Sequence, residues 1–105
     1  MAKKRARVER RRRERELDKI GDARAKLARL TEGGAPERPI EVPSASVIEA
    51  QAVGLGCARC EGEVRVVDHD AVKTAHGVLR RVRAQCKQCR AVREVWLRVV
   101  VPLPS

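Results

Sequence analysis

Two short stretches determine how this chain folds: Cys57-Ala58-Arg59-Cys60 and Cys86-Lys87-Gln88-Cys89, with 25 residues between them. Two residues between the cysteines of a pair let both sulfurs reach one ion, and two pairs complete a four-coordinate shell. The 25 intervening residues suffice for a β-hairpin that brings the pairs together. The sequence therefore predicts one four-cysteine site formed by Cys57, Cys60, Cys86 and Cys89. The alternatives are a disulfide framework and two separate redox pairs.

The rest of the chain makes a metal at this site the favoured interpretation. Its 105 residues are 43% hydrophobic but include one Trp, no Phe and no Tyr, so a small domain here buries little area and needs a staple. No apolar export signal follows the N-terminal charges, and no stretch is long enough for a membrane span. We therefore expect a cytoplasmic protein whose thiols stay reduced.

Zinc is the expected ion, one Zn²⁺ per chain in a structural role. Iron in a rubredoxin-like shell is the rival, but that shell usually has aromatic neighbours, and this chain has only Trp96. Because the protein fills all four positions of the shell, no water can be activated there. The sequence therefore predicts a protein that is not an enzyme and has no small-molecule substrate.

Segment 57–101 resembles the zinc-ribbon superfamily in its order of knuckle, hairpin, knuckle and closing strand. The spacing is most similar to the ribbon of transcript elongation and cleavage factors, which carries an acidic pair at its hairpin tip. Asp68-His69-Asp70 lies in the comparable loop, but the adjacent Asp-Glu pair is absent, so that activity is not carried over. The resemblance implies a small metal-stabilised β domain, a three-stranded antiparallel zinc ribbon. Together with the helix expected from the N-terminal composition, the predicted fold is this ribbon with a basic N-terminal α-helix. Such ribbons occur in transcription factors, ribosomal proteins and many adaptors, so the resemblance indicates the fold far more than the function.

Composition divides the chain into three parts. Residues 1–30 form a basic helical arm, because they are rich in strong helix formers and contain no Pro. Residues 31–46 form a Pro/Gly linker, and residues 47–105 form the zinc-ribbon domain. Within this domain we expect either one helical turn or a strand near 47–52.

Three strands are expected in the domain, at 63–67, 78–85 and 92–101, the last stopped by Pro102 and Pro104. Residues 68–77 are polar and are predicted to form the hairpin loop. Gly62 follows the first cysteine pair, where we expect a residue that tolerates positive φ.

Charge points to a polyanionic partner. The net charge is +10, and residues 1–30 contribute 13 basic and 5 acidic side chains. Counterion release favours binding of such a segment to nucleic acid. An anionic membrane is disfavoured, because the first half of the arm has no large apolar residue to insert. The predicted nucleic-acid contacts of the arm are Lys3, Lys4, Arg5, Arg7, Arg10, Arg11, Arg12 and Arg13.

A second group of contacts is predicted on the sheet. If the pleat points Val64, Val66, Val82, Ala84, Val95, Leu97 and Val99 inward, then Arg65, Arg81, Arg83, Trp96 and Arg98 point outward. Arg81, Arg83 and Arg98 could then hold a nucleic-acid backbone while Trp96 stacks on a base. The competing interpretation is that arginine stems shield Trp96, or that it packs on residues 47–55.

Apolar residues spaced by three and four continue the arm: Leu17, Ile20, Ala23, Leu27 and Leu30. This stripe could dock on the ribbon, on a second copy or on a protein partner. The sequence therefore favours non-catalytic binding of nucleic acid or a ribonucleoprotein through the arm and the sheet face. The alternative is a protein–protein interaction adaptor with a structural zinc site.

Overall fold

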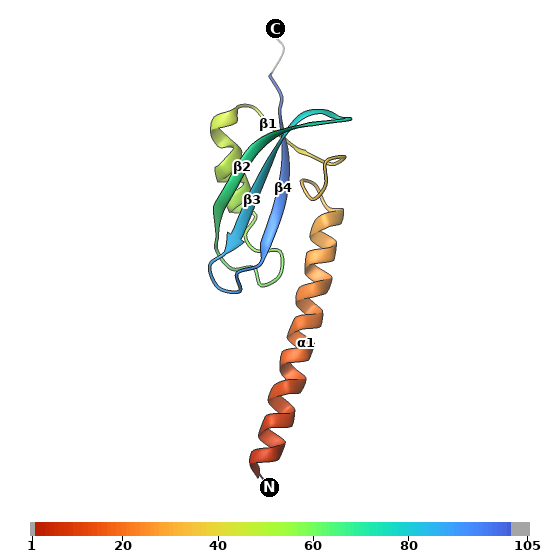
Figure 1. Cartoon of the computed structure of the whole chain (residues 1–105), viewed down its shortest axis with the longest axis vertical. Coiled ribbons are helices and arrows are strands. Elements are labelled where there is room, and N and C mark those ends of the chain that lie inside the picture. Colours follow the sequence, from red (N-terminus) through yellow and green to blue (C-terminus); the bar gives the residue numbers. More distant parts are fainter. Residues whose placement is uncertain (1, 102–105) are drawn as a thin grey trace.

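A long helix stands beside a small mixed domain in the computed structural model, which describes residues 2–101, with side chains from Lys4 onward (Figure 1). Lys3, Pro102 and Pro104 thus lie outside the described side chains. The elements are α1 (Ala2–Leu30), β1 (Ile40–Val42), a 3₁₀ turn (Ala45–Val47), α2 (Ile48–Gly54), β2 (Val64–Thr74), β3 (Gly77–Cys86) and β4 (Val92–Val99).

The predicted N-terminal helix is confirmed as α1, a single helix of 29 residues. It ends at a polar turn, where the Thr31 hydroxyl donates to the carbonyl of Ala28 over 2.9 Å. Gly33 follows at φ +84°, a left-handed angle that glycine adopts without strain. α1 therefore extends far from the sheet and gives the molecule extents of 73 × 24 × 22 Å (Figure 1). Within the described residues, no helix combines the length and the apolar character that a membrane crossing requires.

The expected three-stranded antiparallel sheet is wrong, because the structure has four strands in the order β1-β4-β3-β2 and β1 is parallel to β4. The additional strand comes from residues predicted as linker. Ile40 and Val42 are buried on either side of exposed Glu41, so three residues suffice to cover the edge of β4 at Leu97–Val99. Prolines at positions 39 and 43 border this strand, which is why its composition indicated a linker.

The predicted loop at 68–77 is also wrong over most of its length. β2 continues to Thr74 and pairs antiparallel with β3, and only Ala75 and His76 form the turn. The Thr74 hydroxyl closes this turn by donating to the carbonyl of Gly77 over 2.9 Å. Cross-strand ion pairs stabilise the polar part of β2, where Asp70 pairs with Arg81 at 2.7 Å and Asp68 with Arg83 at 3.6 Å. Such pairing across strands compensates for the poor strand propensity of aspartate.

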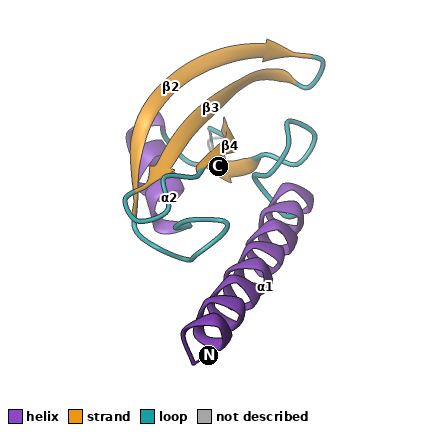
Figure 2. Ribbon diagram, turned by 60° about the horizontal axis from the view of Figure 1, so that its bottom comes forward, coloured by secondary structure: helices purple, strands orange, loops and turns teal. Residues whose placement is uncertain are grey.

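One face of the sheet carries the core, and α2 covers it (Figure 2). α2 also decides between the two alternatives near 47–52 in favour of a helix. Two of its side chains, Ile48 and Ala52, are fully buried. Their partners in the core are Ile40, Val42, Val82, Val95 and Leu97, with Val66 and Val99 partly buried beside them.

Trp96 lies on the opposite face of the sheet, directly across from Arg81 in the β3–β4 register. It is only 8% exposed, and the Arg81 guanidinium lies over its ring at 5.8 Å from the centroid. Because α2 packs against the other face, Trp96 does not pack on residues 47–55. Of the interpretations that the sequence offered for Trp96, shielding by an arginine is the one that agrees with the structure.

Candidate metal centre

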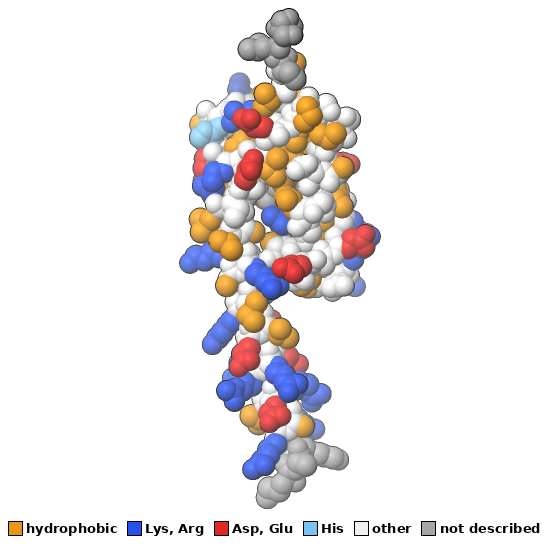
Figure 3. All heavy atoms as spheres, turned by 180° about the vertical axis from the view of Figure 1, so that it is seen from behind, with side chains coloured by type: hydrophobic (Ala, Val, Ile, Leu, Met, Phe, Trp, Pro, Cys, Tyr) orange, Lys and Arg blue, Asp and Glu red, His pale blue; other side chains and the backbone are white. Residues whose placement is uncertain are grey.

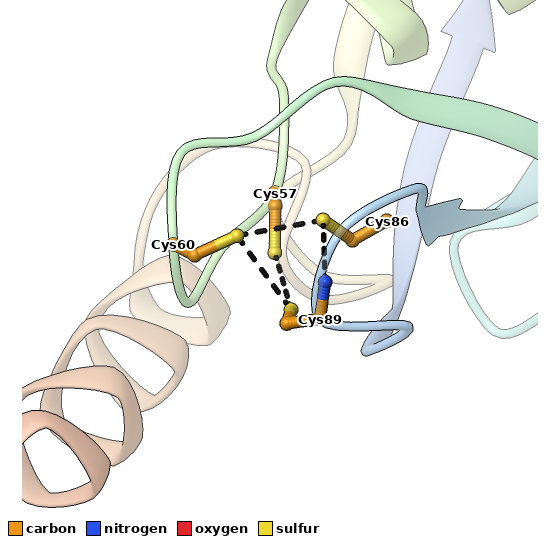
Figure 4. Close-up of side chains that lie close together, drawn as sticks. All are labelled: Cys57, Cys60, Cys86 and Cys89. Atoms are coloured by element: carbon orange, nitrogen blue, oxygen red, sulfur yellow. Dashed lines mark hydrogen bonds between the residues drawn. The ribbon is translucent and has the colours of Figure 1, made fainter. Parts of the chain in front are cut away.

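Four sulfurs meet at the end of the sheet (Figure 4). Cys57 and Cys60 come from the loop before β2, Cys86 is the last residue of β3, and Cys89 lies in the turn that follows. All four lie within 4.8 Å of one another. The Sγ–Sγ distances are 3.5 Å for Cys57–Cys89, 3.4 Å for Cys60–Cys86 and 3.6 Å for Cys60–Cys89. The predicted convergence of the two pairs is therefore confirmed.

The cluster fits a tetrahedral metal and not a disulfide framework. All four cysteines are free. Metal–sulfur bonds of about 2.3 Å in a tetrahedron place the sulfurs about 3.8 Å apart, close to the observed spacing. Cys57 and Cys86 are buried, whereas Cys60 and Cys89 are exposed. The cluster could thus hold one metal ion at the protein surface, with two ligands fixed in the domain interior.

The two cysteine pairs have the same pattern of backbone hydrogen bonds. The amide of Cys57 donates to the carbonyl of Gly62, and the amide of Cys86 donates to the carbonyl of Ala91, both over 2.9 Å. Backbone amides also point at the sulfurs, from Arg59 to Cys57 Sγ and from Gln88 to Cys86 Sγ, each over 3.3 Å. These donors stabilise thiolates, which are the form that binds a metal.

The residue with positive φ after each pair is not the one that the sequence suggested. Glu61 has φ +62° and Arg90 has φ +63°, so the left-handed position directly follows the last cysteine of each pair. Gly62 is required for a different reason. A Cβ there would lie 3.0 Å from Gln88 Oε1 and 3.1 Å from the sulfurs of both Cys60 and Cys86, so any larger residue would crowd the cluster.

The thiols do not ionise equally. The backbone N–H of Cys89 is the main cause that lowers the pKa of Cys86 to about 6. Burial raises the pKa of Cys57, but backbone N–H donors from Cys60 and Arg59 outweigh it and lower the pKa overall. For Cys89 the backbone N–H of Ala91 lowers the pKa, yet burial and the neighbouring thiols raise it to about 12. Four thiolates at this spacing therefore require a cation among them.

Arg93 on β4 supplies positive charge beside the cluster. Its side chain is half-buried and donates from Nη1 to the carbonyl of Gly56 over 3.0 Å. Burial lowers the pKa of this guanidinium, while the charge of Cys57 raises it. Four thiolates around a divalent cation carry two net negative charges, so a nearby guanidinium offsets part of that charge. Sequence reasoning missed this residue, because only the strand register brings it near Cys57.

The first cysteine pair also anchors α1. Arg59, between Cys57 and Cys60, reaches Asp22 of α1 at 2.5 Å, and Glu61 lies 3.8 Å from Arg24. Gly21 is buried below Arg59, and a Cβ there would meet the guanidinium at 2.9 Å. The hydrogen bond that Arg59 donates to Asp22 is the main cause that raises the pKa of Arg59. Gly21 is thus the point where the loop that carries Cys57 and Cys60 contacts the helix.

Contact between α1 and the domain is otherwise limited. A cavity of about 380 Å³ remains between them, lined in part by Ala25, Ala28, Ala58, Val92 and Arg93. The helix residues before Gly21 are exposed wherever their side chains are described.

The predicted nucleic-acid contacts on the sheet lie among carboxylates. Arg81 is held by Asp70 through two hydrogen bonds, of 3.2 and 2.7 Å. Arg83 lies 3.2 Å from Glu94 and 3.6 Å from Asp68. Arg98 is partly buried on β4, with a buried Nε that has no hydrogen-bond partner within the described residues.

The predicted contacts on the arm are placed differently. Lys4, Arg5, Arg7, Arg10, Arg11, Arg12 and Arg13 are all exposed on α1. In the described part of the chain, Arg12 is the one member of this group with an ion pair, to Glu16 at 3.6 Å. Figure 3 shows the basic side chains distributed along the projecting helix, clear of the domain.

Comparison with known proteins gives no relative, since no protein-family model, curated protein or solved structure matches this chain.

Proposed function

We propose that this protein is a non-catalytic nucleic-acid-binding protein in which one structural Zn²⁺ holds the domain and α1 binds the phosphate backbone. Zinc is proposed because a shell of four tetrahedral thiolates is typical of structural zinc sites. Cys57, Cys60, Cys86 and Cys89 would hold it and leave no position for a reacting water. The protein would then act by binding alone.

The observation that carries the proposal is a basic stripe along the free part of α1. Lys4, Arg7, Arg11 and Arg15 are exposed and separated by three or four residues, so they share one side of the helix. A helix rises about 5.4 Å per turn, so the stripe presents about one cation per turn. This spacing lets several side chains reach phosphates of one backbone together.

The charge of the stripe is available to a ligand. In the described residues, these four side chains make no ion pair within the chain, whereas Arg81 and Arg83 on the sheet are held by carboxylates. Each phosphate neutralised by a free cation releases condensed counterions, which is the main source of non-specific affinity for nucleic acid. The arm therefore supplies the affinity in this proposal, and the domain fixes one end of the arm.

Trp96 has no part in the proposed contact. At 8% exposure under Arg81, its ring offers no face to a base. Binding should therefore show little preference for base identity, because stacking and base-edge contacts are what read sequence.

The test is fluorescence anisotropy with short DNA and RNA duplexes and the zinc-loaded full chain. The arm variant carries Arg7→Gln, Arg11→Gln and Arg15→Gln. The matched control carries Arg65→Gln, Lys73→Gln and Lys87→Gln, three exposed cations on the domain. Both variants lose the same net charge, so a difference between them reports the location of the contact.

We expect the arm variant to bind at least about tenfold more weakly, since each lost phosphate contact removes part of the electrostatic free energy. The control should stay within about threefold of the natural chain. Equal losses in both variants would show that charge alone matters and would contradict the arm as the binding element. If the natural chain did not bind at low salt, nucleic-acid binding itself would be contradicted.

A further inference from the structure

α1 has two different sides along residues 17–30. Toward the domain it presents small residues, with Gly21 buried and Ala25 and Ala28 half-buried. The large apolar residues lie elsewhere on the helix and are largely uncovered. Their exposed fractions are 67% for Leu17, 49% for Ile20, 62% for Leu27 and 62% for Leu30. We call these four residues the leucine stripe.

The leucine stripe is turned away from the chain's own domain. Successive helix residues are about 100° apart, which places the centre of the stripe about 130° around the helix from the side that carries Gly21 and Ala25. Docking on the domain therefore does not cover it. A row of exposed large apolar side chains on one side of a helix is typical of an interaction site.

The spacing of the leucine stripe identifies its partner. The intervals between its members are three, seven and three residues, which read the same in both directions. An antiparallel copy of the same helix would place Leu17 against Leu30 of the second copy, and Ile20 against Leu27 of the second copy. Ile20 and Leu27 lie about 20° apart around the helix and would form the centre of the contact, about a two-fold axis between Ala23 and Arg24. Leu17 and Leu30, about 140° apart, would lie at its two edges.

Charge selects the antiparallel direction. A parallel pair would set two runs of Arg10 to Arg13 side by side, and like charges at such contacts are repulsive. An antiparallel pair separates these runs and directs each toward the partner's linker, where Glu32, Glu37 and Glu41 are exposed. Arg24 near the axis already has a carboxylate beside it, since Glu61 lies at 3.8 Å.

We propose that the leucine stripe binds a second copy of this chain, with the two α1 helices antiparallel. The inference goes beyond the nucleic-acid proposal and does not depend on it. The basic stripe of Lys4, Arg7, Arg11 and Arg15 lies on the other side of α1, about 165° around the helix from the centre of the leucine stripe. Pairing therefore leaves the basic stripe open on both chains.

Sedimentation equilibrium of the zinc-loaded full chain tests the pairing. The stripe variant carries Ile20→Lys and Leu27→Lys. The control carries Val8→Lys and Val78→Lys, which are 61% and 63% exposed and lie outside the stripe. We expect a reversible dimer for the natural chain and the control, and at least about tenfold weaker association for the stripe variant. A monomeric natural chain, or a stripe variant that associates as well as the control, would overturn the proposal.

Disulfide cross-linking tests the direction. A Leu17→Cys chain and a Leu30→Cys chain of different mass are mixed with zinc bound, so that the four native thiols are protected. Antiparallel pairing predicts that the mixed product exceeds the product of two Leu17→Cys chains, whose added thiols would lie about 20 Å apart along the helices. Dominant linkage of Leu17→Cys chains to each other would show a parallel pair and overturn the proposed arrangement.

Discussion

Gly62 lies in a confined space beside the cysteine cluster. Its position after Cys60 suggests a glycine chosen for backbone freedom, yet the left-handed residue is Glu61. A Cβ added at Gly62 would lie 3.1 Å from the sulfurs of Cys60 and Cys86, one from each pair. Gly62 is therefore the place where the two halves of the cluster approach most closely.

Gly62→Ala should weaken both the fold and metal binding. The added methyl group forces Cys60 or Cys86 to move, and overpacking of this kind typically costs about 1–3 kcal/mol. The control is Gly54→Ala at the end of α2, where a Cβ would meet nothing within 4 Å. Thermal unfolding and chelator competition of the zinc-loaded chains measure the effect. Equal stability of the two variants would contradict the steric role of Gly62.

At the level of elements, the contact between α1 and the first cysteine pair links the helix to the cysteine cluster. Arg59 and Glu61 reach Asp22 and Arg24 from the loop that carries Cys57 and Cys60. Solvent-exposed ion pairs add little to the free energy of folding, so these contacts orient the helix more than they stabilise it. The helix direction should therefore depend on the order of the loop.

Arg59→Ala should release the C-terminal part of α1 without unfolding the sheet. The matched control is Gln88→Ala, because Gln88 occupies the equivalent third position of the second pair. Hydrogen exchange of zinc-loaded chains is the measurement, and we expect faster exchange at residues 18–30 in Arg59→Ala alone. Unchanged exchange in that segment would show that the contact does not order the helix.

The elements differ in how far the sequence predicts them. α1, β3, β4 and the cysteine cluster follow from local patterns: helix formers without proline, alternating valines, and two CxxC pairs. β1 and the second half of β2 depend on partners distant in sequence. Ile40 and Val42 become a strand only because the edge of β4 is open, and Asp70 is accommodated by Arg81 across the hairpin. Such non-local pairing leaves no periodic signal in one short segment.

Across the whole molecule, a small domain supports a helix that extends well beyond it (Figure 1). The buried core is formed mainly by Val, Leu, Ile and Ala, with a second small cluster of Cys57, Val64, Ala84 and Cys86 under the sulfurs. Small domains with so little apolar burial need a further source of stability. We expect a metal held by the four cysteines to supply it.

Removal of the metal should therefore unfold the domain. Metal binding and folding are coupled where the free ligands repel one another. A strong chelator added to the reduced full chain is expected to abolish the sheet signal in far-UV circular dichroism and to leave α1 partly frayed, since a helix without tertiary contacts is marginal in water. Added zinc should restore the signal at one ion per chain. A sheet that persists after the metal is removed would contradict a structural role.

The salt dependence of binding to a short DNA duplex measures whether α1 contacts phosphates. The logarithm of the binding constant falls with the logarithm of salt concentration by about 0.9 for each phosphate neutralised. We predict a steep slope for the natural chain and a slope shallower by up to about 2.7 for the chain with Arg7→Gln, Arg11→Gln and Arg15→Gln. Identical slopes for the two chains would show that these arginines touch no phosphate and would contradict nucleic-acid binding by α1.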